Sequence, residues 1–174
     1  SPPAGLTASH ASSRHPLTRL THSDDAGQAR MVDISAKSPT QRMARATGAI
    51  TMRPETLALI RDNQIAKGDV LTVAKIAGIM GAKRTAELIP LCHPIALSDI
   101  HLQLSLDESL PGIRVEATAR TTGTTGVEME AIVAVSVSLV TLYDMAKGVD
   151  KGMEIGQISL IEKRGGKSGD WVRG

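Results

Sequence analysis

Two stretches of alternating apolar and polar residues constrain the fold most strongly. Apolar side chains occupy every second position from Ile100 to Leu106 and again from Ile113 to Ala119. Because successive side chains of a strand point to opposite faces, each stretch predicts a β-strand with one buried face. Pro111-Gly112 lies between them and favours a turn. The two strands are therefore expected to pair as an antiparallel hairpin.

The residues around this hairpin follow helix and strand patterns in turn. We predict a strand over about 44–52, helices over about 54–62, 69–87 and 127–147, and a last strand over about 155–163. Gly78 and Gly81 allow another element to approach the second helix closely. The order strand, two helices, hairpin, helix, strand is the split β-α-β arrangement. It predicts an α+β, ferredoxin-like fold, in which helices pack on one face of a four-stranded antiparallel sheet.

Length and composition indicate an ordinary globular domain. The chain has 174 residues, 41% of them hydrophobic and 22% charged, which suits one domain with a core of its own. Residues 1–19 are rich in Ser, Pro, Ala and His and show no periodicity. We expect a flexible N-terminal tail there and a single domain over 20–174.

Several partners and locations are disfavoured. The net charge is only +2 and aromatic residues are 1%, so we expect no nucleic-acid partner that depends on base stacking. The longest apolar run, Ala131–Val140, is too short to cross a membrane, and the first twenty residues contain no continuous apolar core typical of a signal peptide. Cys92 is the single cysteine. We therefore expect a cytoplasmic protein without disulfides.

The loop around His93 is the first candidate for chemistry. Pro90 and Pro94 flank Leu91-Cys92-His93, and their rings restrict the backbone that carries the imidazole. By itself this pattern fits a functional histidine as well as one that hydrogen-bonds within a turn. Cys92 is predicted to be a buried, inert thiol.

Acidic residues at both ends of the last predicted helix form the second candidate. Glu128 and Glu130 project about 200° apart on a helix, so they cannot face one pocket as a carboxylate pair. Asp144 and Lys147 share a face, either as a surface ion pair or as an acid–base pair. Glu130 and Asp144 face the same way but lie about 21 Å apart along the axis. If both serve one pocket, a second subunit must complete it.

Basic residues are distributed along the chain and could together hold an anion. They are Lys67, Lys83, Arg84, Lys163, Arg164 and Lys167. Gly165–Gly169 is not a Walker A motif, because a glycine is required six positions before Lys167 and Ile161 stands there. None of the five histidines has metal-ligand spacing, and we expect no metal site.

Eight motifs together resemble the cyclic pyranopterin monophosphate synthase family, also called the MoaC family, of molybdenum cofactor biosynthesis. They are LTH (20–22), MVDISAK (31–37), KGDV (67–70), IAGIMGAKRT (76–85), LIPLCHP (88–94), TGVEMEA (125–131), YDMAK (143–147) and GGKSGDW (165–171). The resemblance spans about residues 20–171.

The resemblance implies a reaction and an assembly. The substrate would be a GTP derivative whose ribose is cyclised onto carbon eight of guanine, and the products cyclic pyranopterin monophosphate and pyrophosphate. The chain would be a lyase that needs no redox cofactor, and the need for Mg²⁺ with the triphosphate is left open. Relatives of this kind are hexamers, trimers of dimers, with active sites at the dimer interface.

The resemblance also implies residue roles. Asp144 would be the main catalytic residue, with Lys67 and Lys147 as acid–base or phosphate-contacting groups and Glu128 supporting catalysis. The substrate would be bound by Leu91, Cys92, His93, Met129, Glu130, Lys83, Arg84, Lys163 and Lys167, and His93 would also move protons.

A different class of function also fits a ferredoxin-like domain with an anion pocket. Such a chain could be a regulatory module that binds a purine nucleotide without converting it. A regulatory module needs the cationic pocket but not Asp144 with two lysines, and RNA binding is a weaker third interpretation.

Overall fold

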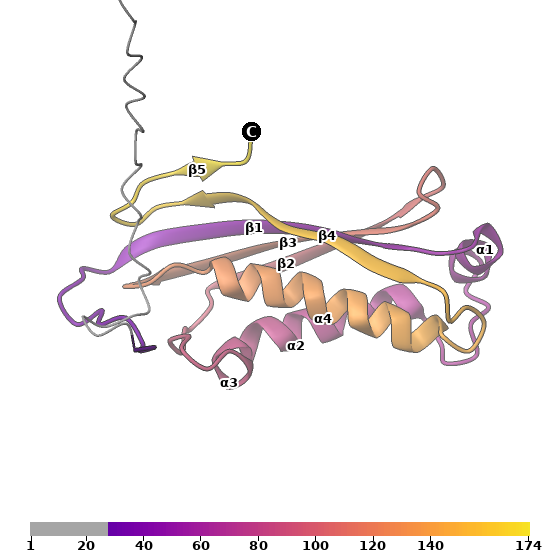
Figure 1. Cartoon of the computed structure of the whole chain (residues 1–174), viewed down its shortest axis with the longest axis horizontal. Helices are drawn as coiled ribbons and strands as arrows, with labels where there is room; N and C mark the ends of the chain where they lie inside the picture. Colours follow the sequence, from indigo (N-terminus) through magenta and orange to yellow (C-terminus); the bar gives the residue numbers. More distant parts are fainter. Residues whose placement is uncertain (1–27) are drawn as a thin grey trace, which may run out of the picture. The chain divides into compact units, whose positions relative to one another are not determined.

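A five-stranded antiparallel sheet forms the framework of the unit Asp33–Gly174 (Figure 1). The computed structural model describes residues 28–174. The strand order is β2-β3-β1-β4-β5. The strands are β1 (Thr40–Thr51), β2 (Asp99–Asp107), β3 (Gly112–Gly123), β4 (Glu154–Arg164) and β5 (Trp171–Val172). The predicted tail at 1–19, the LTH motif and His10, His15 and His22 lie outside the described residues.

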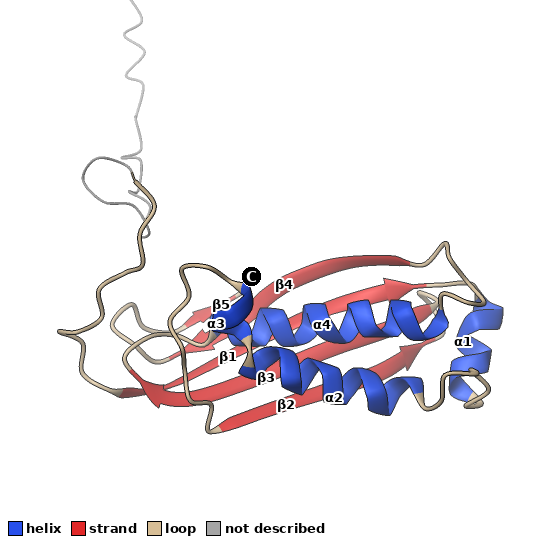
Figure 2. Cartoon of the chain, turned by 90° about the horizontal axis from the view of Figure 1, so that it is seen from below, coloured by secondary structure: helices blue, strands red, loops and turns tan. Residues whose placement is uncertain are grey.

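Helices cover one face of this sheet, as predicted (Figure 2). They are α1 (Pro54–Arg61), α2 (Val70–Lys83), α3 (Thr85–Leu88) and α4 (Glu128–Ala146). Figure 2 shows α2 and α4 lying side by side over the sheet, roughly along the strands, with α1 at one end of the sheet. The hydrophobic core lies between this helix pair and the sheet. Its fully buried members include Ile50, Leu102, Val115, Val135 and Leu139.

The predicted hairpin is confirmed, and it has the expected faces. β2 and β3 pair in an antiparallel register that places Leu102 opposite Ala117 and Leu104 opposite Val115. These alternate positions point toward the helices, and Leu102 and Ala117 are completely buried. Burial of one face specifies the register, because a slip of one residue would move every apolar side chain to the solvent.

The glycines of α2 have the role that the sequence predicted, and α4 is the element that they admit. A Cβ atom on Gly78 would lie 2.3 Å from Leu102 Cδ2 and 2.9 Å from the carbonyl oxygen of Ala134. A Cβ atom on Gly81 would lie 2.8 Å from Val137 Cγ2. Only a residue without a side chain lets the two helix backbones pack this closely.

Two predictions about the fold are wrong. The sheet has five strands and not four, because Trp171 pairs with Lys163 after the turn at Gly165–Gly169. A strand of two residues is too short to produce an alternating pattern. The helix predicted over 69–87 is interrupted at Arg84. There the Arg84 N–H bonds to Gly81 O, three residues back, which tightens the last turn of α2 and ends it.

α4 is apolar along most of its length. Its 19 residues are long and apolar enough to cross a membrane, although the longest continuous apolar run in the sequence is too short to indicate this. Inside the fold, 56% of its most apolar 18-residue window is buried. This burial against α2 and the sheet is what a core helix requires.

Candidate functional site

Two lysines, one of them from a segment that is distant in the sequence, converge on Asp144, near the end of α4. Lys67 Nζ lies 3.1 Å from Asp144 Oδ2 and 3.1 Å from the Asp144 carbonyl oxygen. Lys147 Nζ lies 3.0 Å from Asp144 Oδ1. All three side chains are about half exposed. The predicted ion pair of Asp144 with Lys147 is confirmed, and Lys67 joins it from the turn before α2.

The two lysines determine the charge of this carboxylate. Hydrogen bonds from Lys147 and then Lys67, together with their positive charges, lower the pKa of Asp144 from its ordinary value. Asp144 is therefore ionised at neutral pH. A carboxylate held between two ammonium groups can accept a proton, and the ammonium groups can donate one or hold an anion.

A second cluster surrounds the first turn of α4, at the opposite end of the helix pair. A cavity of about 360 Å³ is lined by Lys83, Arg84, Glu130 and residues of α3 and the following loop. Glu130 is only 2% exposed, and its Oε2 atom has no hydrogen-bond partner among the described residues. Glu128 does not line this cavity; its carboxylate folds back toward Gly126, whose Cβ would lie 2.0 Å from Glu128 Oε2.

Burial controls the chemistry of Glu130 and its neighbour Cys92. Desolvation raises the pKa of Glu130 to about 7, and the nearby charge of Glu128 adds to the increase. Cys92 Sγ lies 3.9 Å from Glu130 Oε1. Desolvation and then Glu130 raise the pKa of the Cys92 thiol, so it stays protonated at neutral pH. That agrees with the prediction of an inert thiol. The prediction that Cys92 is buried is wrong, because its side chain is only half-buried in the loop.

The loop that precedes β2 carries most of the other residues predicted to bind substrate near the first turn of α4. Leu91, Cys92 and His93 are half-buried, as is Met129 in the first turn of α4. Cys92 N–H bonds to Ile89 O at 3.2 Å, which closes the turn at Pro90. The loop therefore places Cys92 beside Glu130. Leu91, His93 and Met129 are not among the described residues that line the Glu130 cavity.

The C-terminal turn forms a third cluster, which the sequence only partly predicted. Lys167 lines a cavity of about 410 Å³ together with Lys37 and Arg42, two cations not singled out from the sequence. Lys163 Nζ donates to Ser168 Oγ. Gly165 and Gly166 have φ near +85°. A Cβ atom on Gly166 would lie 2.3 Å from Arg42 Nη1, so the absence of a side chain at Gly166 leaves room for the Arg42 guanidinium.

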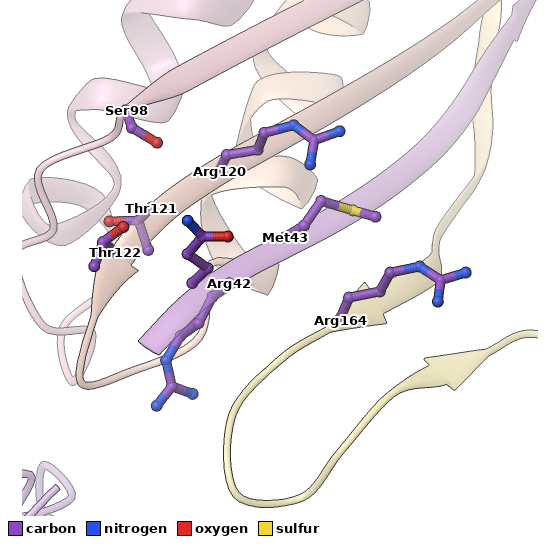
Figure 3. A pocket seen from close by; sticks show the side chains of 8 residues that line it. Arg42, Met43, Ser98, Arg120, Thr121, Thr122 and Arg164 are labelled. Atoms are coloured by element: carbon purple, nitrogen blue, oxygen red, sulfur yellow. The ribbon is translucent and has the colours of Figure 1, made fainter. Parts of the chain in front are cut away.

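Another cavity, of about 340 Å³, lies at the end of the sheet near Arg120 and Arg164 (Figure 3). Arg120 and Arg164 extend from their strands with Met43 between them, whereas Arg42 extends in another direction (Figure 3). Arg164 is already paired with Glu162 and Asp170. None of the predicted catalytic residues is among the described residues that line this cavity, and we do not place the reaction there.

The predicted site residues thus form separate groups within one copy of the chain. Glu130 and Asp144 are separated by about 21 Å along α4, and the cavity that Glu130 lines does not include Asp144. Between the two groups, α2 and α4 leave four large apolar side chains exposed. They are Val73, Ile76, Met80 and Val140, which are 39%, 53%, 50% and 60% exposed, and we call them together the α2–α4 patch.

The acidic and sulfur-containing residues do not gather as metal ligands. Within residues 28–174, no group of three or more His, Cys, Asp or Glu side chains is arranged to hold a metal ion. The cationic clusters instead present ammonium and guanidinium groups, which suit phosphate oxygens.

Comparison with known proteins shows which family the chain resembles. Cyclic pyranopterin monophosphate synthase of Brucella ovis is 59% identical over 154 residues, which cover 88% of this chain and 93% of that protein. The synthase of Brucella canis is 58% identical over the same length. Among solved structures, the extracellular region of zebrafish Gpr126/Adgrg6 aligns with 74% of this chain and 15% of its own, with a TM-score of 0.29 and 13% identity. That last likeness carries no argument.

The family model covers both ends of the helix pair and ends within the C-terminal turn. The MoaC family model matches residues 31–166, a span that includes Lys67, Asp144, Lys147 and the Glu130 cavity. The chain belongs to the MoaC family.

Proposed function

We propose that this chain is a cyclic pyranopterin monophosphate synthase, a lyase of molybdenum cofactor biosynthesis. The substrate is a GTP derivative whose ribose is cyclised onto carbon eight of guanine. Water opens the five-membered ring of the guanine, the pyranopterin closes, and a cyclic phosphate forms as pyrophosphate leaves. The observation that carries this proposal is Asp144 held between Lys67 and Lys147 in a member of the MoaC family.

The Asp144 cluster suits this chemistry because every step moves protons without net oxidation. Asp144 is the proton acceptor, since its lowered pKa keeps it ionised at neutral pH. The two ammonium groups supply protons to leaving nitrogen or oxygen atoms, or stabilise developing negative charge. No redox cofactor is needed for these steps.

The other clusters bind the substrate in this proposal. Lys83 and Arg84 line the Glu130 cavity and attract phosphate oxygens. The base and ribose part is contacted by Leu91, Cys92, His93, Met129 and Glu130. His93 also moves protons, and Glu128 supports catalysis from the first turn of α4. Lys163 and Lys167 hold the remaining phosphates.

The substrate-binding end and the catalytic end must come from two subunits. The α2–α4 patch lies between them, and α2 and α4 run antiparallel, because Lys67 precedes α2 and approaches the end of α4. A second copy that packs on this patch about a two-fold axis brings its Asp144 to the Glu130 cavity of the first copy. We therefore propose a homodimer with two composite sites, and a hexamer built from three dimers.

The fold and location follow the same proposal. The order β4-β1-β3-β2 of the four long strands supports a ferredoxin-like classification, to which β5 is an addition. We also propose that the enzyme works in the cytoplasm, on a small phosphorylated substrate and not on nucleic acid or membrane.

Turnover is the direct test. The purified chain is incubated with the cyclised GTP intermediate, with Mg²⁺ or with a chelator, and the release of pyrophosphate and an oxidisable pterin is followed. Asp144→Asn should abolish both products, with Asp62→Asn as the matched surface control. Binding of the intermediate without turnover by the wild-type chain would contradict the proposal and favour the nucleotide-binding module.

Subunit mixing tests the composite site separately. Asp144→Asn and His93→Ala should each be inactive alone. In a mixed dimer, one of the two sites combines a wild-type Asp144 end with a wild-type His93 end. Random exchange of subunits should therefore restore about a quarter of the wild-type activity, and no recovery after demonstrated exchange would exclude a shared site.

A further inference from the structure

We propose that Asp150 is a positioning residue for the Asp144 cluster: its buried carboxylate caps α1 from the turn after α4, and so holds Lys67 against Asp144. The inference deepens the proposed function and rests on it for its activity readouts. Asp150 touches neither Lys67 nor Asp144, and it acts through the two segments that carry them.

The contacts of Asp150 join the start of α1 directly to the turn after α4. Its side chain is only 5% exposed. Asp150 Oδ2 accepts hydrogen bonds from Arg53 N at 3.0 Å and from Thr56 Oγ at 2.9 Å, and Oδ1 accepts one from Gly152 N at 3.1 Å. A buried carboxylate with three donors in two segments fixes their separation.

α1 depends on this carboxylate because its own sequence supplies no cap. Arg53 precedes the helix and makes no side-chain capping bond to it within the described chain, and Pro54 occupies the first turn. The first N–H groups of a helix need an acceptor, and a negative charge there is favourable. Asp150 provides both from a position 97 residues later in the sequence.

The turn after α4 is tied down by further bonds on either side of Asp150. Asp150 N–H and Val149 N–H both bond to Ala146 O. Tyr143 Oη donates to Lys151 O at 2.8 Å, and the Arg53 guanidinium donates to Val149 O. These bonds therefore fix the turn rigidly to the end of α4, where Asp144 lies.

The segment that leads from the end of α1 to Lys67 is short and is anchored on both sides of Lys67. Ile65 is buried in the core, Gly68 N–H bonds to Ile65 O, and Asp69 caps α2 by accepting from Thr72 N. Lys67 is held between these two anchors. Loss of the Asp150 contacts would free the start of α1 and, through it, the position of Lys67 relative to Asp144.

The charges that act on the two carboxylates are separate. Asp144 is faced by Lys147 from its own helix and by Lys67 from the turn before α2. Asp150 is faced by Arg53, whose backbone N–H is the main cause of its lowered pKa. A change at Asp150 therefore reaches Asp144 by moving Lys67, and its signature is a rise in the pKa of Asp144.

The test compares Asp150→Asn with the surface control Asp62→Asn. For Asp150→Asn we expect kcat to fall at least about tenfold while KM changes less than twofold, and the acid limb of the pH–rate profile to move to higher pH. A merely structural role would lower the folded fraction and reduce activity equally at every pH. An unchanged acid limb and an unchanged kcat per folded molecule would overturn the inference.

Two further variants keep the test decisive if Asp150→Asn fails to fold. Thr56→Val removes one bond at nearly constant volume and should shift the acid limb in the same direction by a smaller amount. In the Lys67→Met background, Thr56→Val or Asp150→Asn should cost little more activity, because both act through Lys67. Additive losses, or a Thr56→Val profile identical to wild type, would overturn the inference.

A measurement without substrate separates this inference from the proposed function. Carboxyl carbon NMR titration of Asp144 should give a higher pKa in Asp150→Asn and Thr56→Val than in wild type, even if the wild-type chain converts no substrate. An unmoved Asp144 titration in both folded variants would contradict the positioning role directly.

Discussion

Lys67 Nζ lies 3.1 Å from both the carboxylate and the backbone carbonyl oxygen of Asp144, although the two residues are 77 positions apart in the sequence. The contact joins the turn before α2 to the end of α4. The contact therefore depends on the antiparallel packing of the two helices. Because Lys67 lowers the pKa of Asp144, the protonation of Asp144 also depends on this packing.

Removal of Lys67 should change the pH dependence of the reaction. Lys67 and Lys147 lower the pKa of Asp144, so Lys67→Met should raise this pKa toward the ordinary value of an aspartate. If the reaction needs ionised Asp144, activity falls and the acid limb of the pH–rate profile moves to higher pH. Lys75→Met, on the exposed side of α2, is the control and should leave the profile in place.

Glu130 should make the folded chain less stable as the pH rises. Burial raises its pKa to about 7, above the ordinary value of 4.5, so the folded state holds a proton that the unfolded state has lost. Stability is then full below about pH 4.5 and decreases as the pH rises to about 7. A pKa that differs by one between the folded and unfolded states corresponds to about 1.4 kcal/mol, so the loss should be roughly 3 kcal/mol.

Glu130→Gln tests this assignment because an amide does not titrate. Urea unfolding at pH 5 and pH 8 should show a smaller decrease for the variant than for the wild type, and Glu154→Gln on the exposed edge of β4 is the control. An equal decrease in wild type and Glu130→Gln would contradict the raised pKa.

Gly78→Ala should destabilise the fold by forcing α2 and α4 apart. The new Cβ would lie 2.3 Å from Leu102 Cδ2 and 2.9 Å from Ala134 O, and the backbone oxygen cannot move away cheaply. Overpacking of this kind costs roughly 1–3 kcal/mol. Gly148→Ala is the control, since its Cβ meets no described atom within 4 Å, and chemical denaturation of both variants measures the difference.

A charge in the α2–α4 patch should prevent assembly without unfolding the subunit. Val140 is 60% exposed in a single copy, so Val140→Asp costs the isolated subunit little, but it places an unpaired charge in the proposed interface. Sedimentation should show smaller species and the activity should fall, while Lys75→Glu keeps the wild-type assembly. An unchanged assembly in Val140→Asp would exclude this surface as the dimer interface.

The elements most visible in the sequence are those whose signal lies within a few consecutive residues. The alternation over Ile100–Leu106 predicted β2 with its correct buried face, and Gly78 and Gly81 predicted a close approach to α2. β5 was missed because two residues carry no periodicity, and the break at Arg84 was missed because the helical pattern continues through it. The cationic cavity of Lys37, Arg42 and Lys167 was missed because its members come from three separate segments.

The sequence by itself determined the strand and helix periodicity, the pairing of Asp144 with Lys147 and the family motifs, because each depends on residues close together along the chain. Only the tertiary structure decided that Lys67 reaches Asp144, that Glu130 is buried with an unpartnered oxygen, and that Asp150 caps α1. These contacts join segments up to 97 residues apart. Their formation depends on how the helices pack on the sheet, and no local pattern encodes that packing.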